Sequence, residues 1–124
     1  MLITVAETIE LHDKIILASG GSPGMRDAGL LESAIMGCYQ SFDGVDLYPS
    51  VIEKSARIAY SICKNHPFVD GNKRTAVMSM LMTLRMNDII LKYPQKDLVT
   101  LGVGIEENRI DYEGIVAWIK NRLL

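Results

Sequence analysis

Cysteine and proline are scarce in this sequence, and long apolar runs are missing. Only two cysteines and four prolines occur among the 124 residues. Cys38 and Cys63 each lie within an apolar helical pattern, which favours two buried free thiols over a disulfide or a metal site. No apolar stretch is long enough to cross a membrane, and residues 1–14 lack the basic start and long hydrophobic stretch of a secretion signal. We therefore expect a cytoplasmic protein that makes no membrane contact.

An excess of positive charge is also missing. Thirteen Lys and Arg residues stand against fifteen Asp and Glu residues, which gives a formal net charge of −2. Such a chain lacks the overall positive field that nonspecific nucleic-acid binding generally uses, so no direct binding of nucleic acid is expected. Any basic site must be local, and Lys73 and Arg74 form one adjacent basic pair.

No break in composition divides the chain. It contains no Pro/Ser-rich linker, no low-complexity tract and no repeat of solenoid length. Its length and its hydrophobic content of 48% are enough for one compact domain with a core of its own. We expect a single domain over residues 1–124.

Apolar residues recur at helical spacing along almost the whole chain, and strand-like alternation is confined to short pieces. Capping boxes and aspartates at N-cap positions predict where several helices begin. Six helices are expected: 4–20, from about 27, 50–65, 73–86, after 94, and from about 111. The fourth is apolar on nearly every side, and its methionines suit core gaps, so it should lie in the middle. The sequence therefore predicts an all-α class, a compact bundle around a central buried helix.

Two segments between helices carry further expectations. Residues 41–49, with Phe42, Gly44 and Tyr48, interrupt the helical pattern and indicate an ordered loop or short hairpin. Pro67 ends the third helix and should push His66 into an extended conformation, so that a loop presents its side chain. His12 falls on the polar face of the first helix, where we expect a structural role.

The segment HPFVDGNKRT, residues 66–75, is a short loop that leads directly into the central helix. Asp70, Gly71 and Asn72 have turn chemistry, because Gly71 tolerates positive φ and either polar neighbour can cap the next helix. The backbone amides of such a turn, together with a helix N-terminus, make an anion site suited to phosphate.

Lys73 and Arg74 break a rule, because they place positive charge in the first turn of a helix. Each misplacement costs about 0.3 to 1 kcal/mol when the site is empty. A bound polyanion reverses the sign, so we interpret the conflict as an indication of phosphate binding. The alternative is that both side chains extend to solvent or pair with carboxylates.

Two further side chains in this segment suggest chemistry. The imidazole of His66 is a natural acceptor for the proton of an attacking hydroxyl. Asp70 has the chemistry to hold Mg²⁺ together with phosphate oxygens, although a role as a capping or turn residue accounts for it equally well.

The stretch HPFVDGNKRTA resembles the signature of the Fic/Doc family, His-x-Phe-x-Asp/Glu-Gly/Ala-Asn-x-Arg, which lies in a loop before a helix. Its fixed positions are matched here by His66, Phe68, Asp70, Gly71, Asn72 and Arg74. The chain length and the helix-loop-helix order also agree, so the resemblance extends over the whole chain and implies the Fic/Doc fold.

Within the family the sequence resembles the Doc (death-on-curing) branch. AMP-transferring Fic proteins have glycine where this chain has Lys73, and a second arginine where it has Val77, whereas Gly71 matches the Fic pattern. The Doc resemblance implies the toxin of a type II toxin-antitoxin pair, a kinase that moves the γ-phosphate of ATP to a threonine or serine of elongation factor Tu and halts translation.

The resemblance also implies roles for individual residues. His66 becomes the general base, Asp70 the Mg²⁺ ligand and Phe68 the anchor of the loop. The nucleotide and phosphate site comprises Gly71, Asn72, Lys73 and Arg74. ATP and Mg²⁺ are the implied cofactors, and residues 41–49 resemble the flap that positions the target.

A separate antitoxin is a further implication, because the chain contains no inhibitory Ser/Thr-x-x-x-Glu-Gly/Asn motif of the kind found in many Fic proteins. The expected antitoxin is Phd-like, a disordered segment that folds into a groove between helices.

Two other functions stay open on the sequence alone. One is AMP transfer from the same site, and the other is a helical protein-binding module without catalysis. A P-loop nucleotidase is poorly supported, because GNKRT lacks the preceding glycine at Walker spacing and no strand leads into it.

Overall fold

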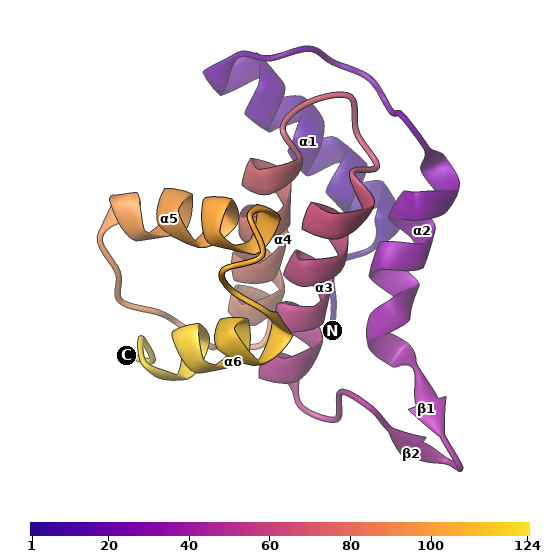
Figure 1. Cartoon of the computed structure of the whole chain (residues 1–124), viewed down its shortest axis with the longest axis vertical. Coiled ribbons are helices and arrows are strands. Elements are labelled where there is room, and N and C mark those ends of the chain that lie inside the picture. Colours follow the sequence, from indigo (N-terminus) through magenta and orange to yellow (C-terminus); the bar gives the residue numbers. More distant parts are fainter.

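The computed structural model describes all residues from Met1 to Leu124. Six α-helices surround one core, with a short 3₁₀ turn and a two-stranded hairpin between the second and third helices (Figure 1). The elements are α1 (Val5–Ser19), α2 (Ala28–Met36), η1 (Gly37–Tyr39), β1 (Ser41–Phe42), β2 (Val45–Asp46), α3 (Val51–Asn65), α4 (Asn72–Met86), α5 (Gln95–Glu106) and α6 (Tyr112–Lys120). The predicted all-α class and the number of helices are confirmed.

Side chains at the N-caps explain where the helices begin. Thr4 and Ser50 each begin a helix with a complete capping box. The hydroxyl accepts from the backbone N–H three residues later, and the glutamate at that position accepts from the N–H of the N-cap residue. Asp27 and Asp111 cap α2 and α6 in the same way with a carboxylate oxygen. All four starts had been predicted, because the capping pattern is local in sequence.

The central helix is α4, which packs against α1, α3 and α5. Figure 1 shows it in the middle of the bundle, with α2 on one side and α5 and α6 on the other. Met80 and Leu84 are fully buried, as predicted for a core helix. Met78, however, is 38% exposed, because it lines a surface groove described below. The core position of α4 means that its first turn is held firmly.

The segment predicted as a loop or hairpin forms a hairpin. Ser41 pairs with Asp46 and Phe42 with Val45, and the chain reverses through Asp43 and Gly44 with positive φ at both. The hairpin projects away from the helices (Figure 1), and Phe42 and Val45 are 72% and 68% exposed. Two bulky apolar side chains are thus displayed at the tip.

No helix of the structure is long and apolar enough to span a membrane. Both cysteines are free and buried, as predicted. Burial raises the pKa of the Cys63 thiol to about 12, and the nearby Glu106 carboxylate contributes to the shift. Burial raises the pKa of Cys38 as well. At neutral pH both groups are therefore protonated and enclosed.

This protonation and enclosure predict that neither thiol reacts with iodoacetamide while the protein is folded, because the thiolate is the reactive form. Mass spectrometry should find no adduct on the native protein and two adducts after denaturation. Rapid labelling of Cys63 in the native state would contradict the packing described above.

Candidate active site

The site is built on the loop between α3 and α4, and His66 stands at its start. His66 is the C-cap of α3 and adopts the left-handed region, with φ 48° and ψ 56°, so the predicted extended conformation is wrong. Its N–H still donates to the carbonyl of Ile62. The Arg26 guanidinium donates to the carbonyls of His66 and Asn65, both at 2.7 Å. These bonds offset the cost of about 1 to 2 kcal/mol for a left-handed residue.

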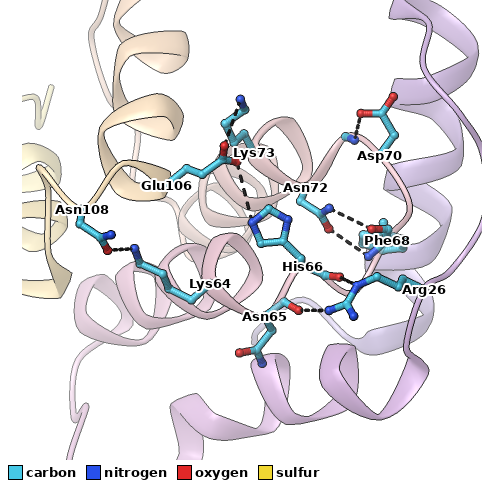
Figure 2. Close-up of polar contacts among 11 residues, drawn as sticks. Arg26, Lys64, Asn65, His66, Phe68, Asp70, Asn72, Lys73, Glu106 and Asn108 are labelled. Carbon is cyan, nitrogen blue, oxygen red and sulfur yellow. Dashed lines mark hydrogen bonds and ion pairs between the residues drawn. The ribbon is translucent and has the colours of Figure 1, made fainter.

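Phe68 holds the middle of the loop in the core, with 2% of its surface exposed. The Asn72 side chain accepts from the N–H of Phe68 and donates to its carbonyl, each at 2.9 Å (Figure 2). The sequence suggested that the side chain of Asn72 or Asp70 caps α4, and this expectation is wrong. Instead Gly71 is the N-cap of α4, with φ 78° and no side-chain bond. Both polar atoms of the Asn72 amide are thus occupied in shaping the loop.

Beneath the loop lies His12, which sequence reasoning placed on a polar face. That placement is wrong, because His12 contacts Phe68 and Asp70 of the loop and is only 1% exposed. Its ring stacks on Phe68 with centroids 3.8 Å apart and planes 6° apart. Its Nε2 lies 2.8 Å from the carbonyl oxygen of Asp70. The expected structural role is confirmed, although the reason is burial.

Asp70 is exposed, and its carboxylate is fastened to two backbone amides. It accepts from the N–H of Ser22 at 3.1 Å and from the N–H of Gly71 at 2.8 Å. These two hydrogen bonds hold the pKa of Asp70 below its usual range. Figure 2 shows the carboxylate turned away from the imidazole of His66. Asp70 is therefore an ionised group at the opposite end of the loop.

Glu106, the last residue of α5, joins the site and was not predicted. Its carboxylate lies 3.6 Å from the Nζ of Lys73 and 3.9 Å from the Nε2 of His66 (Figure 2). Gly102, one turn earlier, allows this approach, because a Cβ there would lie 3.3 Å from the Cβ of Lys73. A glycine inside an amphipathic helix was the only signal in the sequence.

Arg74 reaches the C-terminal end of α1, where its guanidinium donates to the Ser19 hydroxyl at 2.5 Å and to the Gly20 carbonyl at 3.0 Å. Positive charge is favourable at that end of a helix. The alternative considered from the sequence, that Lys73 and Arg74 pair with carboxylates, holds for Lys73, which lies beside Glu106, whereas Arg74 caps a helix. Their presence alone does not indicate phosphate.

A pocket of about 480 Å³ collects these groups. Its lining is His66, Val69, Asp70, Gly71, Asn72, Lys73, Arg74 and Glu106, of which only Val69 is hydrophobic. The first-turn N–H groups of Asn72, Lys73 and Arg74 donate to no acceptor in the protein. The pocket thus combines free amide donors, two cationic side chains and a half-exposed imidazole, a set suited to a polyanion beside a proton acceptor.

A second hollow of about 390 Å³ lies between α1, α4 and α5 and is mainly apolar. We call it the α1/α4/α5 groove; its lining is Ile15, Ala18, Ser19, Lys73, Arg74, Val77, Met78, Gln95, Leu98, Val99, Gly102 and Val103. Lys73 and Arg74 line both hollows. The polar pocket and the apolar groove are therefore adjacent and share their cations.

Comparison with known proteins gives matches over most of the chain. Residues 2–84 match the family model described as the Fic/DOC family. "Protein kinase doc" of Escherichia phage P1 is 35% identical over 113 residues, which cover 91% of this chain and 88% of that protein. "Toxin Doc" of Mycolicibacterium smegmatis is 40% identical over 75 residues, 60% of this chain and 58% of that protein's length. The chain belongs to the Fic/DOC family.

Proposed function

We propose that the protein is an ATP-dependent phosphotransferase of Doc type, the toxin of a toxin-antitoxin pair. It transfers the γ-phosphate of ATP to a threonine or serine hydroxyl of another protein, for which elongation factor Tu is our candidate. The observation that carries this proposal is the pocket in which the imidazole of His66 and the free amides of 72–74 line one space. Similarity to relatives named as a toxin and as a protein kinase supports it.

The amides and cations account for phosphate binding. Phosphoryl transfer is catalysed chiefly by positioning and by neutralising charge on the transferred group. Three backbone donors fixed on a buried helix supply positioning without reorganisation. Lys73 would neutralise phosphate charge when its ammonium group leaves Glu106 and pairs with a phosphate oxygen. Arg74 would do the same when its guanidinium releases Ser19 and Gly20.

His66 supplies the proton acceptor. Its side chain is 47% exposed, so a hydroxyl of a protein target can reach the imidazole from solvent. The oxygen of the hydroxyl forms the bond to the γ-phosphorus, the bond to the β-phosphate oxygen breaks, and the hydroxyl proton passes to His66. ADP leaves, and the carboxylate of Glu106 stabilises the imidazolium that has formed.

Magnesium fits the donor set only together with the nucleotide. No group of three or more His, Cys, Asp or Glu side chains lies close enough to hold a metal ion alone. Mg²⁺ commonly uses one or two carboxylates with phosphate oxygens and water, and Asp70 supplies one ionised carboxylate at the pocket. The ion would neutralise charge on the phosphates.

The target and the antitoxin would use two other surfaces. The exposed hairpin tip, with Phe42 and Val45, offers apolar contacts to a target polypeptide. The α1/α4/α5 groove suits an amphipathic antitoxin helix, whose apolar side would face Val77, Leu98 and Val99. A carboxylate on such a helix would pair with Lys73 or Arg74 at the shared rim.

Transfer from differently labelled ATP tests the proposal. The protein is incubated with elongation factor Tu and Mg²⁺, with ATP labelled at either the γ- or the α-phosphate. We expect protein-bound label from the γ-phosphate only, and the acceptor residue is then found by mass spectrometry. Label from the α-phosphate alone would establish AMP transfer instead. A parallel incubation with a cell extract covers other targets, and absence of both labels from elongation factor Tu and from every extract protein would reject the transferase.

A further inference from the structure

His12 is a buried imidazole that takes no part in the proposed transfer. It is 1% exposed, and Thr8 is the only other buried residue of α1. Core packing would be served by an apolar side chain, which needs no hydrogen-bond partner. The contacts of the ring nitrogens therefore show what an imidazole provides here that an apolar side chain would not.

The ring is fixed from two directions. Its face stacks on Phe68, and its Nε2 lies 2.8 Å from the carbonyl oxygen of Asp70. A carbonyl oxygen can only accept, so the proton must reside on Nε2. The carboxylate of Asp13, on the other side, lies 3.8 Å from Nδ1 and is largely exposed.

The bond to Asp70 fixes one peptide plane at the beginning of α4. The carbonyl of that peptide accepts from His12, while its N–H, on Gly71, donates to the Asp70 carboxylate at 2.8 Å. Gly71 has φ 78°, and a Cβ built on it would lie 3.6 Å from Cδ2 of His12. The imidazole thus lies directly under the turn from which the free amides of 72–74 extend.

We propose that His12 is a positioning residue for nucleotide binding: its Nε2–H holds the 70–71 peptide in the orientation that aims the first-turn amides of α4 at phosphate. This inference rests on the proposed function. Without the donor, the Asp70 carbonyl in the free protein can turn towards water. Nucleotide binding must then return this peptide to its original orientation. The free energy needed for that rotation lowers the affinity for the nucleotide.

Two matched variants separate the donor from the stack. His12→Phe keeps an aromatic ring against Phe68 and removes the donor, whereas His12→Gln keeps an N–H donor and removes the ring. We expect His12→Phe to weaken binding of ATP with Mg²⁺, measured by calorimetry, by roughly tenfold, the effect of one lost hydrogen bond. His12→Gln should recover most of the affinity even if its melting temperature is lower. Equal affinity of His12→Phe and the parent, or equal weakness of both variants, would overturn the proposal.

A measurement on the unaltered protein keeps the proposal testable if His12→Phe does not fold. Long-range ¹⁵N–¹H NMR of the imidazole should show the Nε2–H tautomer, and an Nδ1–H tautomer would refute the bond to Asp70. Failure of the parent itself to bind ATP would reject the proposed function and not the tautomer, so the two failures are distinguishable.

Discussion

Replacement of His66 by alanine should lower phosphate transfer by about 10²- to 10⁴-fold, the usual contribution of a general base. The imidazole is half exposed, and the one polar partner of its ring is the carboxylate of Glu106, 3.9 Å away. Its backbone bonds to Ile62 and Arg26 do not need the ring. The variant should therefore fold normally, bind ATP with near-parental affinity and lose turnover. Initial rates with γ-labelled ATP at saturating target measure the effect.

Growth arrest in expressing cells gives a second readout of the same change. If the arrest depends on catalysis, His66→Ala relieves it, whereas Lys96→Ala, an exposed change at the far end of α5, does not. Arrest by His66→Ala as strong as that by the parent would reject the enzymatic account. It would favour instead a helical module that acts by binding a partner.

Among the substitutions considered for this protein, Phe68→Ala should lower the free energy of unfolding most. The side chain is 2% exposed and stacks on His12, and large-to-small changes at such aromatic sites cost about 3 to 5 kcal/mol. The chain offers a matched control in Phe42, its only other phenylalanine, which is 72% exposed. Phe42→Ala should change the free energy of unfolding by no more than about 0.5 kcal/mol.

Urea denaturation of both variants, monitored by circular dichroism, measures the difference. We expect the midpoint of Phe68→Ala to fall well below that of Phe42→Ala, and nucleotide binding to fall with it, because the ring seats the loop. Similar midpoints for the two variants would show that Phe68 does not anchor the loop to the core.

Much of the fold could be predicted because its signals are local. Capping boxes at Thr4 and Ser50 mark helix starts through bonds within four residues. The apolar character of 73–86 placed α4 at the centre. The conformation of His66 could not be predicted in this way, because Arg26, distant in sequence, stabilises the left-handed cap. Proline restricts its neighbour, but it does not determine which permitted region tertiary contacts select.

In the candidate site, too, the features that are local in sequence could be predicted and the contacts between distant segments could not. The motif grouped His66 with residues 70–74 correctly around one pocket, since they share a loop. Neither His12 nor Glu106 could be placed there from spacing, because each reaches the loop from another helix. The partners of Lys73 and Arg74 were missed for the same reason: they become neighbours only when α1 and α5 pack on α4.

The two cations shared by the polar pocket and the α1/α4/α5 groove make the occupancies of these hollows thermodynamically linked. A groove ligand that attracts Lys73 or Arg74 weakens nucleotide binding by some factor, and reciprocity requires the nucleotide to weaken that ligand by the same factor. The antitoxin proposed above, if seated there, would not need to cover the imidazole to inhibit the proposed transfer. If the proposed function is correct, the cell's ATP concentration would set how tightly such an antitoxin must bind to keep the toxin inactive.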